Sequence, residues 1–575
     1  MKKLSTKIKL PPQAIAKVSI AVCLLLTACH SKGINQTDQT LLANKKDSEA
    51  MWAFLSGQLF YEQEKSVKAA KSLIKAKKLL EDREQLDEIN PTLVDIQLKR
   101  GKTKAALDAL EESLSRSAND LTLLEQKVGL LIALNRHEEA LKISEAILAQ
   151  NRKDLNAAVL KMALRLFLNK NNQTAITIDE FDSEIRQEPL MLYIAGLSKE
   201  LSGDIEGGLA DYQLAAKGDP GDPLYQTQLL RVAVKKMDQT MLRGASLKLA
   251  MLGLSNTEYQ QILQEIILAS AKPIITNQKF LSDIRLRIAL KQLSLGEPIK
   301  AKQHLMFLLA SDPNHNEGRY YLASILAGIG RKQDALWELS KINSNDPLAA
   351  KAALFAAFLL HQNNKIKQAE TWLRKSLKQY PDNNETIFAL AENLEAQGKY
   401  TEAAKMLENI SKPIKNNPNY LFHYAALLYK TPEKDRAIAI MEDLIKKDPN
   451  NTNAANFIAY HLAVENRDLN RAYELINHAI TIDGNNGYFI DTLGWIYYQR
   501  GELEKAVQQL RRAALMTDYN PTISYHLVIS LKALKKESEA KEIARIALSR
   551  PVDKEVLSPT EDIESRNYLK SFVEQ

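Results

Sequence analysis

Cysteine is nearly absent from this 575-residue sequence, which has only Cys23 and Cys29. Both residues lie near the N-terminus, Cys23 inside an apolar run and Cys29 at its end. No pair of cysteines is therefore left in the body of the chain to form a disulfide. The folded body has to be stabilised by packing, even in an oxidising compartment.

Catalytic motifs are missing as well. The sequence contains no H-E-x-x-H zinc motif, no G-x-x-x-x-G-K-[ST] phosphate loop, no G-x-S-x-G nucleophile turn and no C-x-x-C pair. The nine histidines are scattered along the chain and do not form a metal-ligand pattern. The sequence therefore predicts a protein that is not an enzyme, with no cofactor, no metal site and no small-molecule substrate.

A strong charge imbalance is absent too. The chain has 77 basic and 70 acidic residues, for a formal net charge of +7. Five of the lysines lie within the first 28 residues, which contain no acid, so the remainder carries 72 basic against 70 acidic residues. This balance gives no electrostatic reason to expect nucleic acid as a partner.

The N-terminus is typical of a bacterial export signal, with a basic region that ends at Lys17 and an apolar run over residues 18–28. Eleven helical residues cannot span a hydrocarbon core of roughly 30 Å. The run ends in Leu26-Thr27-Ala28-Cys29, which resembles the lipobox of bacterial lipoproteins. This resemblance implies that residues 1–28 are removed and that Cys29 is acylated, palmitate included. An ordinary secretory signal is the alternative.

The residues after Cys29 suggest where the chain is attached. His30 and Ser31 follow it, and the absence of Asp there favours the outer membrane by the rule of enteric lipoproteins. We expect a protein of the cell envelope, lipid-anchored in the inner leaflet of the outer membrane and facing the periplasm. Residues 29–48 are polar, with few apolar residues, and are expected to form a flexible tether to the first helix.

Small residues recur at a fixed interval in the second half of the chain. Starting from the stretch Gly487–Asp518, the spacing is 34 residues at every step except one of 35, which an inserted residue in the Arg467–Asn470 turn explains. The series is Ala301, Ala335, Ala369, Ala403, Ala437, Ala472, Ala506 and Ala540. Such a period indicates repeated helix pairs in which the second helix approaches the first closely at the small residue.

The stretch Gly487–Asp518 also matches a known repeat. Its Leu493-Gly494, Tyr497, Ala506, Leu510 and Ala513 follow the pattern of the tetratricopeptide repeat (TPR), with Ile490 in the Trp place. The resemblance implies an all-α fold, a TPR-like right-handed superhelical solenoid of antiparallel helix pairs. About 13–14 repeats are expected, followed by a C-terminal capping helix.

The phase of the repeat divides the chain into segments. Residues 49–254 form an N-terminal array of degenerate repeats, and residues 281–550 form the regular array. The phase is lost between them, so residues 255–280 are expected to be an irregular helical joint. Residues 551–575 are expected to form the capping helix, because Ser558-Pro559-Thr560-Glu561 is a capping box with Pro at the first helical position.

In arrays of this family the first helix of each pair lines a groove, into which the second, fifth, ninth and twelfth places of the repeat point. Carried over by the resemblance, these places predict a partner-binding groove of aromatic and amide side chains: Asn453, Asn456, Tyr460, Tyr488, Asp491, Trp495, Tyr498 and Tyr525. Such side chains suit an extended peptide or a partner helix. Alternatively, some of these rings pack between neighbouring helices.

The leading hypothesis is a non-enzymatic, lipid-anchored envelope scaffold, in which the groove binds another envelope protein or a peptide during assembly of a cell-envelope or secretion complex. The membrane is then contacted through the lipid anchor. The alternative is a regulator that activates a periplasmic cell-wall enzyme without doing chemistry itself.

Overall fold

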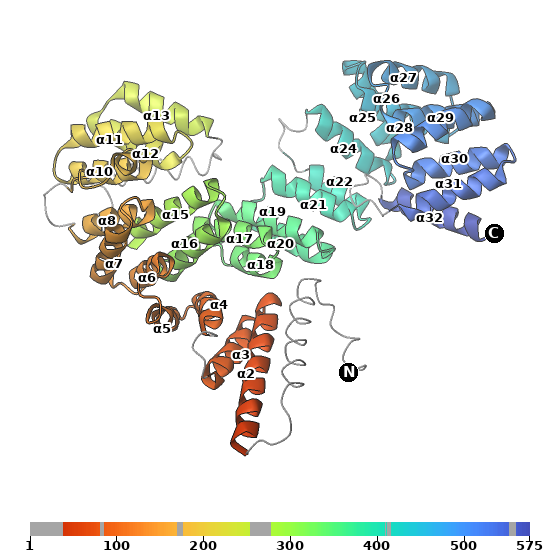
Figure 1. Ribbon diagram of the computed structural model, residues 1–575. Coiled ribbons are helices and arrows are strands. Elements are labelled where there is room, and N and C mark those ends of the chain that lie inside the picture. Colours follow the sequence, from red (N-terminus) through yellow and green to blue (C-terminus); the bar gives the residue numbers. More distant parts are fainter. Residues whose placement is uncertain are drawn as a thin grey trace. The chain divides into compact units, whose positions relative to one another are not determined.

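The computed structural model describes residues 38–80, 86–169, 176–252, 278–408, 410, 416–550 and 559–575 (Figure 1). Within these ranges the chain forms 29 helices and no strand, which confirms the predicted all-α fold of helix pairs. The chain divides into two compact units between Leu348 and Ala349.

The first unit begins with a long helix and continues as shorter helices, most of them three to four turns long and the shortest, α9, of four residues. Its helices are α2 (Asp38–Glu62), α3 (Ser66–Leu79), α4 (Leu86–Lys99), α5 (Thr103–Leu114), α6 (Leu121–Ala133), α7 (His137–Gln150), α8 (Leu155–Leu168), α9 (Ser183–Arg186), α10 (Pro189–Leu201), α11 (Ile205–Gly218), α12 (Pro223–Lys236), α13 (Gln239–Met251), α15 (Gln278–Ser294), α16 (Pro298–Ser311), α17 (Asn316–Gly328) and α18 (Lys332–Ser340).

The second unit is the more regular one and ends in a single unpaired helix. Its helices are α19 (Leu348–His361), α20 (Ile366–Gln379), α21 (Asn384–Glu395), α22 (Tyr400–Glu408), α24 (Pro418–Tyr429), α25 (Lys434–Lys447), α26 (Thr452–Val464), α27 (Leu469–Ile482), α28 (Gly487–Gln499), α29 (Leu503–Met516), α30 (Pro521–Ala533), α31 (Glu537–Ser549) and α32 (Pro559–Glu574).

Asparagine caps start the first helix of successive pairs in the second unit. The Asn486 side chain accepts from the backbone N–H of Tyr488, and Asn520 accepts from Thr522 and Ile523. These bonds satisfy donors that the first turn of a helix leaves unpaired. The recurring amides therefore fix where each pair begins.

A left-handed residue ends the first helix in several of the pairs. Gly398 and Gly501 have φ of 73° and 76° there, and Asn364 and Asn466 occupy the same place with φ of 56° and 48°. In the turn that carries the inserted residue, Asp468 is left-handed as well, with φ of 43°. Left-handed backbone closes the turn between antiparallel helices at little cost for Gly and Asn.

The eight alanines of the 34-residue series are all fully buried, with exposed fractions of 0%. The first helix of a pair can also carry a small residue where the two helices cross. A Cβ placed on Gly494 of α28 would lie 2.6 Å from Leu510 Cγ of α29. The two helices can therefore pack this closely only because Gly494 has no side chain.

The first unit does not follow the segments expected from the sequence. Instead of starting a separate array after a joint at 255–280, α15 and α16 fold back against α4, α6 and α8 (Figure 1). Phe307 of α16 packs where Gly129 of α6 has no Cβ, since a Cβ there would lie 2.4 Å from the ring. Lys302 adds an ion pair with Asp95, with 2.7 Å between Nζ and Oδ2. Residues 253–277 of the joint lie outside the described part.

The expected tether at 29–48 also differs from the structure, because α2 already begins at Asp38. An acid in the first turn and the helix formers Leu41, Leu42 and Ala43 favour this earlier start. Residues 29–37, Cys29 among them, and the signal at 1–28 lie outside the described residues.

The capping helix at the C-terminus matches its prediction. α32 covers Pro559–Glu574 and buries Leu569 and Phe572 in a core shared with α30 and α31. Residues 551–558 of the expected segment are not among those described. This helix covers apolar surface that the last pair would otherwise expose.

We predict that Gly494→Ala destabilises the second unit by about 1–3 kcal/mol, because the new methyl group overpacks against Leu510. Urea unfolding followed by circular dichroism measures this loss. Gly244→Ala in α13 is the control, since a Cβ there meets nothing within 4 Å and Ala favours a helix by up to about 1 kcal/mol. Equal stability of wild type and Gly494→Ala would contradict the proposed close crossing.

Candidate functional site

The eight residues predicted to bind a partner lie on three neighbouring first helices. α26 contributes Asn453, Asn456 and Tyr460, and α30 contributes Tyr525. The other four come from α28, which packs against both α26 and α30. The 34-residue period therefore brings side chains together that are up to 72 positions apart in the sequence.

Five aromatic rings form a continuous cluster across these helices. The Trp495 ring stacks on Tyr498, with centroids 4.7 Å apart and planes at 9°, and on His526, at 4.5 Å and 25°. Tyr460 and Tyr525 approach His526 at 6.1 Å and 5.7 Å. We call these five residues the aromatic stack. Its members are half-buried except His526, which is buried.

A buried carboxylate holds the centre of the aromatic stack in place. Nδ1 of His526 lies 2.9 Å and 3.1 Å from the two carboxylate oxygens of Asp491. Because an ionised carboxylate only accepts, this ring nitrogen carries the proton. Asp491 was predicted to face the groove, but it is only 6% exposed. It positions His526, which in turn supports the Trp495 ring.

The remaining predicted residues differ in exposure. Asn453 is exposed, and Tyr488 is 56% exposed and lies outside the aromatic stack. By contrast, the Asn456 Oδ1 and Trp495 Nε1 atoms are buried and have no hydrogen-bond partner among the described residues. An acceptor and a donor thus remain without a partner beside the rings, and each unmade bond costs about 1–3 kcal/mol.

His526 is the residue that sequence reasoning missed. It follows Tyr525 at the sixth place of its repeat, which the groove rule does not include. The sequence does carry one signal for His526. An acidic residue, Asp491, stands 35 residues before it, about one repeat earlier. Scattered histidines in the sequence gave no indication of this contact.

Aromatic side chains continue from the stack toward α24. The Tyr429 ring meets Phe457 edge to face at 5.0 Å, and its hydroxyl lies 2.9 Å from Nδ1 of His461. Phe422 contacts Phe457 at 6.4 Å. The first helices of four successive pairs therefore present aromatic surface with polar groups at its edges.

The corresponding places of the first unit are covered by its own chain. Asp95 and Asn156 stand at the ninth and second places of their repeats. Asp95 pairs with Lys302 of α16, and Asn156 lies 3.3 Å from Gln292 of α15. Gly129, at another ninth place, takes the Phe307 ring. In the second unit the main helix contacts instead join elements that are adjacent or next but one in the chain.

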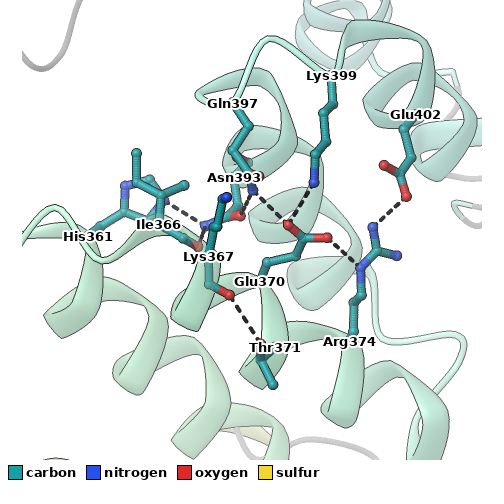
Figure 2. A network of polar contacts seen from close by, with 10 residues as sticks. All are labelled: His361, Ile366, Lys367, Glu370, Thr371, Arg374, Asn393, Gln397, Lys399 and Glu402. Carbon is teal, nitrogen blue, oxygen red and sulfur yellow. Dashed lines mark hydrogen bonds and ion pairs between the residues drawn. The ribbon is translucent and has the colours of Figure 1, made fainter.

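A polar network links the pair α19–α20 to α21–α22 (Figure 2). The Glu370 carboxylate accepts from Arg374 Nε at 2.7 Å, Gln397 Nε2 at 2.8 Å and Lys399 Nζ at 3.0 Å. Buried Asn393 donates to the Ile366 carbonyl at 3.1 Å. These bonds join two repeats, so the polar groups of the network are already paired within the chain.

The hydrogen bonds to Glu370 lower the pKa of its carboxyl group. Burial acts to raise the pKa of this carboxyl, but the hydrogen bonds from Gln397, Arg374 and Lys399 outweigh it and lower the pKa to about 2. A shallow, open depression beside the network is lined by the polar and basic side chains Asn364, Lys365, Lys367, Gln368, Gln397 and Lys399, together with Ile366. We assign the network to structural support of the repeat junction.

Metal-ligand clusters and membrane-spanning helices are both missing from the described residues. No group of three or more His, Cys, Asp or Glu side chains there is arranged to hold a metal ion. None of the helices in that part of the chain is both long and apolar enough to cross a membrane.

Two family models match parts of the chain. The family described as anaphase-promoting complex, cyclosome, subunit 3 matches residues 362–444, and a tetratricopeptide-repeat model matches residues 492–512. The second match covers parts of α28 and α29, and its α28 part includes Trp495 and Tyr498 of the aromatic stack.

Two curated relatives show local similarity. A TPR repeat-containing protein of Pseudomonas aeruginosa is 26% identical over 190 residues, which is 33% of this chain and 26% of the relative. A human protein O-mannosyl-transferase is 23% identical over 245 residues, 41% of this chain and 26% of that protein. The chain thus spans about a quarter of the length of the curated relatives it matches.

Solved structures are similar at lower identity. Yeast Tom70 is 13% identical with a TM-score of 0.33, over 92% of this chain and 96% of that one. A tetratricopeptide repeat protein of Parabacteroides merdae is 17% identical, also with a TM-score of 0.33, over 44% of this chain and 98% of its own.

The helix pairs and the surface of their first helices define a helical-repeat protein. Its 34-residue period, its buried small-residue series and the matching repeat model agree with one another. The chain belongs to the tetratricopeptide-repeat family.

We predict that Glu370→Gln lowers the stability of the second unit by about 1–2 kcal/mol at neutral pH, because charge-assisted bonds are lost. The folded pKa lies below the unfolded value of about 4.3. The stabilisation is therefore present above that value and is lost as pH falls toward about 2. Urea midpoints of wild type and variant should converge over this range.

Glu392→Gln on α21 is the matched control for this experiment, because Glu392 is exposed. Its urea midpoint should follow that of the wild type at every pH. A difference between wild type and Glu370→Gln that stays constant down to about pH 2.5 would contradict the assigned role of Glu370.

Proposed function

We propose that the protein is a non-enzymatic scaffold whose first-helix face, from α24 to α30, binds a protein partner. The observation that carries this proposal is the aromatic stack, held by the buried pair of His526 and Asp491. Rings that are already ordered contribute contact area at a low entropy cost on binding.

The chemistry of the face favours a peptide backbone or a helix with aromatic and aliphatic anchors. The half-buried rings of Trp495, Tyr498 and Tyr525 expose part of their surface. Tyr488 and Asn453 add an exposed edge. A partner that packs against the exposed parts of the rings and bonds the Asn453 amide would cover apolar surface and pair its own polar groups.

We further propose that the scaffold acts in the cell envelope, anchored through acylated Cys29. This proposal is supported by the basic region, the short apolar run and the Leu26-Thr27-Ala28-Cys29 motif. The anchor would hold the protein in the inner leaflet of the outer membrane, with the repeats in the periplasm. A partner in envelope assembly or secretion fits that position.

We expect the double variant Trp495→Ala/Tyr498→Ala to reduce partner recovery at least tenfold in a crosslinked pulldown from envelope extracts, because the stack loses two of its five rings. Trp337→Ala/Tyr473→Ala is the matched control. Trp337 is on α18 and Tyr473 on α27, both second helices. Recovery that falls equally in both double variants, or in neither, would refute binding at the stack.

The lipid anchor is tested by Cys29→Ala. Without an acylated first residue, we expect the protein to leave the membrane fraction and to appear among soluble periplasmic proteins. Fractionation with immunoblotting measures this shift, and mass spectrometry of the wild-type N-terminus identifies the acyl chains. Membrane association that is unchanged in Cys29→Ala would show that the proposed anchor is wrong.

A further inference from the structure

The outer face of α3 is basic and unusually apolar for a solvated helix surface. Five of the 14 residues of α3 are lysines, and none is acidic. Its inner face buries Ala69, Ala70, Leu73 and Ala76, and the helix packs against α2 and α4. Apart from Lys77, which contacts Asn90 of α4 and Glu112 of α5, the lysines of this helix are exposed.

The outward side chains fall on one helical stripe. Val67, Lys71, Ile74 and Lys78 follow each other at steps of four, three and four, which places them on the same face. Lys68 lies beside them and is exposed as well. We call these five residues the α3 face.

Two aliphatic side chains of the α3 face are left in solvent. Val67 is 68% exposed and Ile74 is 37% exposed. Lysines surround them, so the face combines positive charge with apolar tips. Trp52 of α2, which is 73% exposed, adds a further apolar group on the same helix pair.

Acidic neighbours neutralise only part of this charge. Glu49 pairs with Lys75 at 2.6 Å, and Glu112 pairs with Lys77. Lys68 lies over the Phe60 ring at 5.8 Å, and no described acid pairs with Lys68, Lys71 or Lys78. Glu81, Asp82 and Glu84 follow the helix and lie outside the described residues.

We propose that the α3 face docks on a membrane surface rich in anionic lipid headgroups. Lysines are attracted to anionic headgroups, and exposed aliphatic and aromatic tips enter the boundary between headgroups and acyl chains. The place in the chain supports a lipid occupant, because α2 begins nine residues after Cys29. Eight extended residues between them reach at most about 29 Å.

This inference rests on the proposed anchor only for bringing the first helix pair near a bilayer. Acyl chains on Cys29 would hold the chain at the bilayer, and the α3 face would add a contact between the first helix pair and the headgroups. The α3 face would also set the orientation of the first pair on the membrane, which an acyl chain on a short segment does not determine.

The test labels the full chain at Val67→Cys with an environment-sensitive fluorophore, in a Cys23→Ala/Cys29→Ala background so that no other thiol reacts, and adds vesicles. With vesicles of phosphatidylglycerol and phosphatidylcholine we expect emission to rise severalfold, to shift to the blue and to be quenched by nitroxide-labelled lipid. With phosphatidylcholine alone, or at high salt, the change should be absent. Val464→Cys, labelled in the same background, should not respond.

Charge variants decide whether the α3 face causes the response. Lys68→Glu/Lys71→Glu/Lys78→Glu should reduce apparent vesicle affinity at least tenfold, with the milder Lys→Gln set as a check if the first variant misfolds. Lys367→Glu/Lys375→Glu/Lys378→Glu on α20 changes the same number of exposed charges and should leave the response intact. Circular dichroism confirms folding of each variant.

Three outcomes would overturn the inference: a response that survives charge reversal on α3, no response to anionic vesicles, or an emission change produced by nucleic acid or an acidic protein instead. Each of these outcomes can be distinguished from a failure of the proposed lipid anchor. Cys29→Ala fractionation reports on the acyl chain, whereas the labelled Val67→Cys variant reports on the α3 face even if Cys29 is not acylated.

Discussion

The structure depends on the close approach of two helices at a small residue, repeated along the chain. Ala506 is fully buried. On the facing helix Gly494 has no side chain, and Leu510 fills the space where a Cβ would lie. A larger side chain at either place would separate the pair and shift the first helix of the next repeat. The position of Trp495 beside His526, one repeat further on, therefore follows from packing at the crossing within each pair.

The fold was the most predictable part of the protein, because the same residue pattern recurs along the sequence. A 34-residue period in the alanine series predicts helix pairs at every step, and left-handed Gly and Asn residues mark the turns. Contacts within a pair span few residues, so local patterns determine them. The contact between Phe307 and Gly129 has no such signal, since it joins residues 178 positions apart.

The candidate site was predictable in its location but not in its internal arrangement. Groove places taken from the family put Trp495, Tyr498 and Tyr525 on one face, and the structure brings them together around His526. Asp491 was expected at the surface, but it is buried by its bond to His526. A periodicity rule assigns a side chain to a face, whereas the choice between solvent and a neighbour depends on the next repeat.

The return of α15 and α16 to α4 and α6 has a consequence for how the protein is made. An open repeat array can start folding at any pair, because each pair contacts only its neighbours. The first unit has to bring Lys302 and Phe307 to residues near 95 and 129, which are contacts of high sequence separation. During synthesis its early pairs stay partly uncovered until about two hundred further residues have emerged, so this unit exposes apolar surface for longer than the second.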